Sequence, residues 1–494
     1  MHGLGMIAAM GAMLILSACG NSASPDLADG GSTAALAACG PGSLPEGSIQ
    51  GEVPLSDRQS GRSKQGYRCN LELLGQYQGE GASWVNPSTA NCAYMATSFY
   101  GTLTKKSPGV QVVDVSNPAR PALSGTLTSP AMLIGPWESL KVNESRHLLG
   151  AVAGGPLVAA GYFDVYSLSG GCTRPQRLND IAGTPLQLPA DVLGHEGNWS
   201  PDGRTYWSSG LIGGSLTAID VSNPQSPAII WSGIAAFPVN HGVELSEDGN
   251  TLYLATVFPG GVLILDVSDI QQRKPVPAVR TIGQVTWDSQ SVGQHAFPVS
   301  YSGKPYLIAA DEFNAEGVHI VDISNPAAPV VVRHLQLQIQ LPQYAAARAA
   351  DTAGDGLFGY EAHYCAVDRP VNPTALACGF FESGIRVFDI RDPLNPREIA
   401  YFNPPAQTGR FLQLAGSEHA AGLALVPAAS NLSGDVELGA GDYAVNLLHG
   451  NDANLSADWC SSPPRFVAPD QLWVTCQDNG FMVLRFTNGV YPVQ

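Results

Sequence analysis

The sequence predicts an all-β protein, specifically a seven-bladed β-propeller made of four-stranded antiparallel blades. A strand motif recurs seven times between residues 109 and 486, at intervals of roughly 40–60 residues that are typical of propellers and solenoids. Asp-Gly turns between alternating runs indicate antiparallel hairpins. The 494 residues include 55 Gly and 37 Pro with modest charge, as expected of many short strands joined by turns.

The recurring motif is a short β-branched run that ends in an Asp and an Asn-Pro turn. In the copy at Gly317–Pro329, the unbroken Val and Ile residues suit a strand buried on both faces. The Asp and Asn side chains can bond backbone amides beyond the strand, and Pro sets φ for the turn. The other clear copies are Gly109–Pro121, Ser215–Pro227, Gly261–Asp269 and Gly384–Pro396, and the degenerate copies are Tyr162–Leu168 and Gly480–Phe486.

These copies resemble the LVIVD-repeat family, which is named for this strand. The resemblance covers nearly all of residues 69–486, and five of the seven copies match the motif well. It implies repeated β units like those of a propeller.

The pattern of residues 1–19 predicts the export signal of a bacterial lipoprotein. Leu4–Leu16 is an apolar run too short to span a membrane stably. The following Leu16-Ser17-Ala18-Cys19 resembles a lipobox, which implies cleavage before Cys19 and a lipid on that residue. The n-region contains His2 but no Lys or Arg, so the start of the chain is in doubt, and a plain secretory signal is the alternative. We expect a lipid-anchored protein of the cell envelope, on the periplasmic or extracellular side of a bacterial membrane.

Residues 20–66 are rich in Gly, Ser, Ala and Pro without periodicity, which predicts a flexible tether. The propeller then occupies residues 67–494. It contains a long insertion at residues 403–456, between the sixth and seventh blades, and a shorter one at Gln336–Tyr360. Both insertions are expected to rise over one face of the ring and to shape a pocket.

The fourth unit illustrates the expected blade. His241–Ser246 reads as its first strand, Thr251–Val257 as its second, Gly261–Val267 as its third and Ala278–Val285 as its fourth. The Asp-Gly turn before Thr251 joins the first two strands as a hairpin.

The last unit is one strand short at the C-terminus. Only Thr487–Gln494 follows its motif strand, and this segment has little apolar character. Asn70–Tyr77 is available at the other end of the chain. We therefore expect this N-terminal strand to complete the last blade, which leaves no open edge.

One polar residue opens the first strand of each unit. These residues are Glu80, Glu138, His195, His241, His295, His363 and Asp458. Because the first strand of each propeller blade lines the central channel, the seven side chains are expected at one height around one axis.

This ring is a candidate metal site. Imidazole nitrogens suit zinc, copper and iron, so the four histidines are the candidate ligands for Fe, Cu, Zn or Mn. The carboxylates of Glu80, Glu138 and Asp458 would orient the rings through their far nitrogens. The arrangement is similar to the four-histidine iron site of carotenoid oxygenases, although no sequence motif is shared. The alternative is a wet, polar channel in which these side chains bond one another and water.

The sequence has nine cysteines, and eight remain after Cys19. An even number fits an oxidising compartment. Cys365 with Cys378 and Cys460 with Cys476 occupy adjacent strands of single blades, so both pairs are predicted disulfides. Cys39, Cys69, Cys92 and Cys172 cannot be paired from sequence.

Charge and motifs narrow the function classes. A net charge of −17 argues against nucleic acid and anionic membrane surfaces as partners, so we expect a monomer that meets the membrane only through its lipid. The sequence has no nucleophile elbow, P-loop, dinucleotide fingerprint or H-E-x-x-H motif, and catalytic residues stay unidentified. His319 reads as a strand-packing residue, and His147 and His334 as surface residues.

Two hypotheses of function follow. In the first, the propeller is a binding module that presents its loops and channel mouth to a protein, glycan or small molecule. In the second, the axial ring holds a transition metal and the protein is an oxidoreductase or hydrolase acting on a small substrate.

Overall fold

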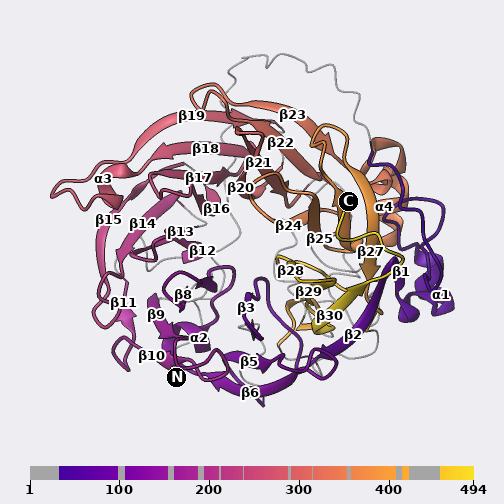
Figure 1. Cartoon of the computed structure of the whole chain (residues 1–494), viewed down its shortest axis with the longest axis horizontal. Coiled ribbons are helices and arrows are strands. Elements are labelled where there is room, and N and C mark those ends of the chain that lie inside the picture. The colour runs from indigo at the N-terminus through magenta and orange to yellow at the C-terminus, as the bar shows by residue number, and fades with distance from the viewer. Residues whose placement is uncertain are drawn as a thin grey trace, which may run out of the picture.

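The computed structural model describes residues 33–97, 106–153, 161–186, 194–210, 213–236, 239–287, 291–313, 315–352, 358–407, 414, 416–421 and 457–493. Seven antiparallel sheets stand around a central axis (Figure 1), which confirms the predicted seven-bladed β-propeller. Residues 1–19 with Cys19, and most of the 403–456 insertion, lie outside the described residues. Within the described ranges, no helix has the length and apolar character needed to cross a membrane.

The first four blades follow the chain in order. Blade 1 contains β3 (Ser88–Thr89), β4 (Cys92–Met95), β5 (Val110–Asp114) and β6 (Ala122–Leu127). Blade 2 contains β7 (Lys141–Asn143), β8 (Leu148–Val152) and β9 (Tyr162–Ser167), with β10 (Gln176–Arg177) and β11 (Thr184–Pro185) both paired to β9. Blade 3 contains β12 (Gly194–Trp199), β13 (Thr205–Gly210), β14 (Ser215–Asp220) and β15 (Ala228–Ile234). Blade 4 contains β16 (Asn240–Leu245), β17 (Thr251–Thr256), β18 (Gly261–Asp266) and β19 (Arg280–Thr286).

The last three blades complete the ring, and two of them use N-terminal strands. Blade 5 contains β20 (Gly293–Tyr301), β21 (Lys304–Asp311), β22 (Val318–Asp322) and β23 (Val330–Leu335). Blade 6 contains β24 (Ala362–Val367), β25 (Ala375–Phe380), β26 (Gly384–Asp389) and β27 (Arg397–Asn403), with β1 (Tyr67–Cys69) as a fifth strand. Blade 7 contains β28 (Arg465–Val467), β29 (Gln471–Cys476), β30 (Gly480–Phe486) and β2 (Leu71–Tyr77).

The ring closes as the sequence predicts. Strand β2 pairs antiparallel with β30, from Leu71 opposite Phe486 to Tyr77 opposite Phe481. The N-terminal strand therefore supplies the outer strand of the last blade. This pairing covers the edge that blade 7 would otherwise expose.

Residues 33–66 are folded against blade 6, whereas the sequence predicts a flexible tether over residues 20–66. This segment contains α1 (Leu55–Ser60) and η1 (Arg62–Gln65). Both carboxylate oxygens of Glu46 contact the guanidinium of Arg386, which is fully buried in β26. A disulfide joins Cys39 to Cys69. Composition misled the prediction because these attachments lie in a distant part of the chain.

All eight cysteines after Cys19 form disulfides. Cys365–Cys378 and Cys460–Cys476 confirm the two predicted pairs within blades 6 and 7. Cys92–Cys172 links blade 1 to a turn of blade 2. Disulfides are typical of oxidising compartments, so the structure indicates an extracytoplasmic protein.

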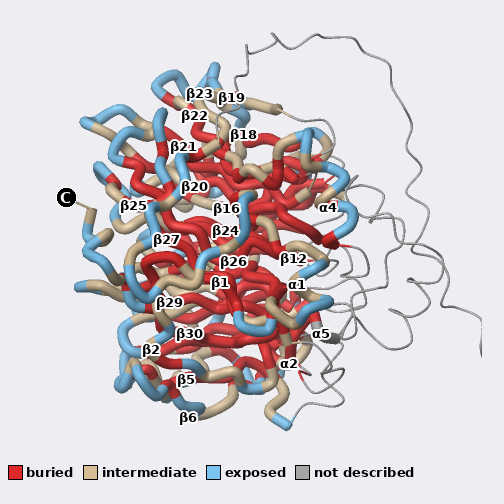
Figure 2. The backbone as a smooth tube through the Cα atoms, turned by 90° about the vertical axis from the view of Figure 1, so that its right-hand side faces the viewer, coloured by how far each residue is buried: buried red, intermediate tan, exposed pale blue. Residues whose placement is uncertain are grey.

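The apolar core lies between the blades. Strands of adjacent blades contribute to shared clusters, such as Trp207 and Leu216 of blade 3 with Leu252 and Leu254 of blade 4. Figure 2 shows the buried strands as a central band. The helices α2 (Pro130–Ile134), α4 (Ala345–Asp351) and α5 (Glu418–Ala421) lie with α1 toward one face of the ring in that view. The remaining short helices are α3 (Ser268–Gln271), η3 (Gln338–Gln340) and η4 (Pro342–Tyr344).

Candidate functional site

The inner strands of blades 3 to 6 share a β-bulge near their first residue. The pairing register shifts between Gly194 and Glu196 in β12, and between Gly293 and His295 in β20. Equivalent shifts occur near the start of β16 and β24. Bulges commonly re-aim side chains, and here they divide the polar residues around the axis into two levels.

The first level is the axial cluster, which we define as Glu138, His195, His241, Glu312 and His363. All five side chains are buried. His195, His241 and His363 come from β12, β16 and β24, Glu138 lies just before β7, and Glu312 directly follows β21. Strands from five different blades therefore bring these side chains to one point on the axis.

In the axial cluster, imidazole nitrogens lie beside the carboxylates of Glu138 and Glu312. The Nε2 atoms of His195 and His241 are 2.8 Å apart. Glu138 Oε2 lies 3.5 Å from Nε2 of His195, and its Oε1 lies 3.2 Å from Nε2 of His363. Glu312 approaches Nε2 of His241 and of His363, each at 3.6 Å. Two sets of potential ligands therefore share Glu138: one contains His195 and His241, and the other contains Glu312 and His363, with the ligand atoms of each set within 4.8 Å of one another.

Backbone carbonyls fix the orientation of two of the rings. Nδ1 of His363 donates to the carbonyl of Ser461 at 2.6 Å, and Nδ1 of His241 donates to the carbonyl of Gln294 at 3.2 Å. A proton on Nδ1 leaves the lone pair on Nε2, which is the nitrogen that faces the cluster. His363 Nε2 is buried, and its contacts with the two carboxylates do not have hydrogen-bond geometry. The pattern is that of metal ligands held by their far nitrogens.

The charges around the axis shift the pKa values of these groups. Burial by itself would raise the pKa of Glu138, but His195, His241 and His363 outweigh it, and that pKa lies well below its usual range. Burial would lower the pKa of His363, but Glu138 and Glu312 raise it to about 10. The pKa of His241 is raised in the same way, while burial and the neighbouring His241 lower that of His195. The carboxylates thus favour positive charge inside the cluster.

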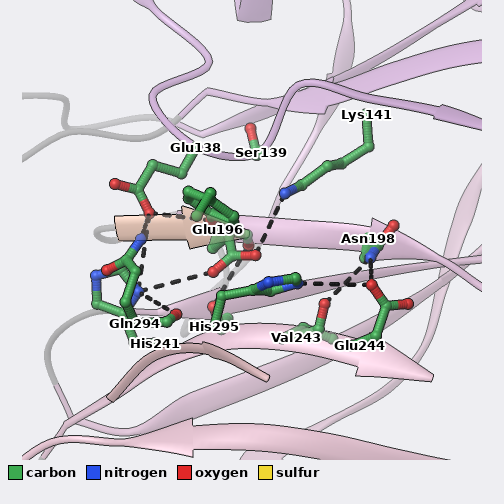
Figure 3. Close-up of polar contacts among 12 residues, drawn as sticks. Glu138, Ser139, Lys141, Glu196, Asn198, His241, Val243, Glu244, Gln294 and His295 are labelled. Carbon is green, nitrogen blue, oxygen red and sulfur yellow. Dashed lines mark hydrogen bonds and ion pairs between the residues drawn. The ribbon is translucent and has the colours of Figure 1, made fainter. Parts of the chain in front are cut away.

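The second level, which we call the polar layer, consists of Lys141, Glu196, His295 and Tyr364. Lys141 Nζ lies 3.4 Å from Glu196 Oε1 and 4.8 Å from the centre of the Tyr364 ring. The other oxygen of Glu196 lies 3.7 Å from His241 Nδ1. Figure 3 shows Lys141 reaching toward Glu196 and His295 pointing toward Glu244, away from Glu138. The polar layer is therefore in contact with the axial cluster.

The structure brings four of the seven predicted ring residues together: Glu138, His195, His241 and His363. His295 does not join them; its Nε2 lies 3.6 Å from Glu244. The register explains the difference, because Gly293 corresponds to Gly194, so the residue equivalent to His195 is Gln294 and not His295. Gln294 indeed points inward and donates to Glu138 Oε2 at 2.8 Å.

Glu80 and Asp458 lie in other environments. Glu80 accepts hydrogen bonds from the backbone N–H groups of Lys106 and Ser107, and it holds that loop. Asp458 accepts from the backbone N–H groups of Asp478 and Asn479, within a buried group that includes His419. Both residues precede their inner strands by several positions, because β3 and β28 begin later than the sequence predicts.

Glu196, Gln294, Glu312 and Tyr364 are members of the site that sequence reasoning missed. Glu196 and Tyr364 directly follow a predicted ligand, and a bulge turns them into the next level. Glu312 directly follows the second strand of blade 5, not the first, so the alignment of first strands could not find it. An acidic pair after an apolar strand, Asp311-Glu312, was the available signal.

Aromatic side chains pack against one side of the axial cluster. The ring of His363 lies 5.0 Å from that of Phe381 and 5.9 Å from that of Trp84, measured between centroids. Trp137 meets His195 edge to face at 4.3 Å. These rings exclude water from that side, which strengthens the electrostatic contacts within the cluster.

The comparisons with known proteins agree with the strand pattern. The LVIVD repeat family matches residues 106–129, 211–232 and 295–335. The chain carries LVIVD repeats. These matches cover parts of blades 1, 3 and 5 of the LVIVD propeller.

Among solved structures, the LVIVD propeller is similar to a periplasmic gluconolactonase of Pseudomonas aeruginosa. The identity is 16%, with 63% of this chain and 83% of that chain covered and a TM-score of 0.44. It is also similar to a protein of Bacteroides uniformis described as a putative 6-phosphogluconolactonase, at 14% identity, 63% and 82% coverage and a TM-score of 0.46. No curated protein matches the chain in sequence.

Proposed function

We propose that the axial cluster binds one divalent transition metal ion and that the LVIVD propeller is an extracytoplasmic, metal-dependent oxidoreductase or hydrolase acting on a small substrate. The observation that carries the proposal is that Glu138 lies within 4 Å of His195, His241 and His363 and so joins two sets of potential metal ligands. The shared position on the axis is reached from five blades. A merely polar channel does not require such convergence.

The balance of charge supports a divalent cation. Glu138, Glu196 and Glu312 provide three carboxylates near the axis, and Lys141 is the ammonium group that pairs with one of them. Three negative charges and one positive charge leave a formal excess of two negative charges. Without a metal, protons on His241 and His363 offset this excess, as the raised pKa values of both rings indicate. A dication replaces those protons.

The donor set restricts the metal. Imidazole nitrogens with carboxylate oxygens suit zinc, iron and manganese, and copper(II) is also compatible. All cysteines after Cys19 form disulfides and supply no thiolate. A bound ion of this kind supplies a Lewis acid that activates water or, for iron, copper or manganese, a redox centre.

The polar layer provides the groups for proton transfer. Burial would raise the pKa of Glu196, but Lys141 and His241 outweigh this effect and lower it. Glu196 is therefore ionised and stands beside a ligand of the axial cluster, where it can accept a proton from a substrate or water. Lys141 holds this carboxylate in place. Glu244 contacts His295 of the polar layer and is 26% exposed, more than Lys141 at 12%, so this end of the layer is the more open to a small polar molecule.

Elemental analysis of the purified protein tests the proposal. Protein prepared without chelators, or reconstituted after chelation, is expected to contain one equivalent of iron, copper, zinc or manganese that depends on the axial cluster. His241→Ala and His363→Ala should each lose this equivalent. Circular dichroism and gel filtration check that both variants are folded.

His147→Gln, at an exposed turn of blade 2, serves as the matched control and should keep the metal. If the wild-type protein takes up no stoichiometric metal after reconstitution, the metalloenzyme proposal fails. The binding module, with a protein, glycan or small molecule as partner, is then the remaining hypothesis.

We also propose that Cys19 carries lipid and is the only attachment of this propeller to the membrane. The lipobox-like Leu16–Cys19 and the disulfides support this placement on the outer side of a bacterial membrane. Cys19→Ala is expected to move the protein from the membrane fraction to the soluble fraction. A variant that stays in the membrane fraction contradicts lipid anchoring at this residue.

A further inference from the structure

A second group of histidines and carboxylates lies in blade 5, away from the axis. It consists of Asp311 at the end of β21, Glu316, His319 in β22 and His334 in β23. His319 and His334 face each other across the two strands, and their rings stack at 4.2 Å with 13° between the planes. The sequence predicts a strand-packing role for His319 and a surface position for His334.

The contacts within this group join all four side chains. Glu316 Oε2 lies 2.8 Å from Nε2 of His334 and 3.8 Å from Nε2 of His319. Asp311 Oδ2 lies 3.3 Å from the same nitrogen of His319. The His334 contact is short but lacks hydrogen-bond geometry, since Nε2 is buried without a hydrogen-bond partner within the described residues. Glu316, His319 and His334 are thus close enough to share one ion.

The group is acidic and has no fixed cation. Within the described parts of the chain, neither Asp311 nor Glu316 forms an ion pair with Lys or Arg. Two carboxylates beside two imidazoles attract a divalent cation electrostatically.

We propose that Glu316, His319 and His334, with Asp311 beside them, form a second binding site for a divalent transition metal. Two imidazoles with one or two carboxylates form a donor set suited to zinc, and copper(II) accepts the same ligands. The nearly parallel rings must change their relative tilt for both lone pairs to meet one ion. His334, on the outer strand of the blade, is 12% exposed against 4% for His319 and so has more room to turn.

The site differs from the axial cluster in its access to solvent. The side chains of Glu316 and His334 are 15% and 12% exposed, whereas those of Glu138 and His363 are 1% and 0% exposed. A hydrated ion can therefore reach the blade 5 site without passing through the channel. The two sites can be loaded and emptied independently.

Trp287 gives the blade 5 site its own optical signal. Its ring stacks on His319 at 4.2 Å, and its indole N–H donates to Asp311 at 2.5 Å. Copper(II) bound at the site should quench the fluorescence of this tryptophan. The quenching should disappear in Trp287→Phe and in His334→Gln.

The decisive experiment uses full-length protein in which the axial cluster is disabled by His241→Ala and His363→Ala. Titration calorimetry with Zn²⁺ should show one remaining equivalent. His334→Gln or Glu316→Gln, added to this background, should abolish that equivalent, while His147→Gln should leave it unchanged. Binding that persists unchanged in both ligand variants overturns the proposal, and so does the absence of Zn²⁺ binding.

If the axial variants do not fold, the zinc stoichiometry of single variants can be compared with that of the wild-type protein instead. The zinc stoichiometry of His334→Gln should then be one equivalent lower than that of the wild-type protein. An equal stoichiometry overturns the proposal. Loss of metal only in the axial variants supports the proposed function without the blade 5 site, so the two can fail separately.

Discussion

Two buried charged clusters of the LVIVD propeller differ in how completely their charges are matched. Arg386 in blade 6 contacts Glu46 and Glu398, donates from Nε to the carbonyl of Ser383 at 2.9 Å, and lies over the ring of Tyr401. Gln50 donates to the second oxygen of Glu398 at 3.0 Å. The guanidinium and both carboxylates thus have aligned partners.

The axial cluster has similar charges and burial but not the same alignment. His363 Nε2 faces two carboxylates without a hydrogen bond to either, and two imidazole Nε2 atoms meet at 2.8 Å. Buried polar groups are normally hydrogen-bonded, and each exception needs an explanation. The comparison teaches that the Arg386 cluster is complete as structure, whereas the axial cluster leaves Nε2 of His363 without a hydrogen bond, a position that the proposed metal would fill.

The largest difference in stability should come from Glu46→Gln. This change leaves Arg386 buried with one ion partner fewer, and breaking a buried ion pair costs about 3–5 kcal/mol. Chemical denaturation should show this loss in the free energy of unfolding, with metal content unchanged. Glu138→Gln should do the reverse, by removing bound metal while changing the stability of the metal-free protein less. If Glu46→Gln and Glu138→Gln changed the free energy of unfolding and the metal content equally, the two clusters would not differ in role.

The pH dependence of stability should separate metal-free from metal-loaded protein. In the metal-free state, the pKa of His363 is about 10, above its value of about 6.5 in an unfolded chain. A raised pKa stabilises the fold fully below pH 6.5, and this contribution is lost as the pH rises toward 10. Each unit of difference is worth about 1.4 kcal/mol.

Thermal unfolding measured from pH 6 to 10 checks this expectation. The metal-free protein should lose stability over that range, and His363→Gln should flatten the loss. Metal-loaded protein should not show it, because a metal-bound imidazole is already deprotonated. A steep decline that persists in His363→Gln would assign the pH dependence to other groups.

The sequence predicted the features that repeat locally and missed those set by long-range contacts. The motif strands, the hairpins and the closure by β2 follow from apolar patterns within each unit and were confirmed. The two disulfides between adjacent strands were also confirmed. Cys92–Cys172 spans 80 residues and joins two blades, so no local pattern could reveal it.

The folded segment of residues 33–66 shows the same limit, because Glu46 and Arg386 are 340 residues apart. In the candidate site, His195, His241 and His363 each lie within 4 Å of Glu138, and their role as metal ligands stays a prediction. The position of His295 depends on a bulge of a single residue. Because side chains alternate between the two faces of a strand, a shift of one residue moves a side chain to a different environment. An alignment of the units by their histidines cannot detect such a shift.

The smallest effect is expected for His295→Gln, and it offers a sharp test of the register in blade 5. His295 contacts Glu244 in the polar layer and does not contact the axial cluster. The variant should therefore retain one equivalent of metal with little change in affinity. Gln294→Ala removes the hydrogen bond to Glu138, and the loss of such an outer partner typically weakens metal affinity about 10–100-fold. Metal titration of the two variants compares neighbouring positions on one strand. If His295→Gln loses the metal and Gln294→Ala keeps it, the ring is made of the four histidines and the bulge lies elsewhere.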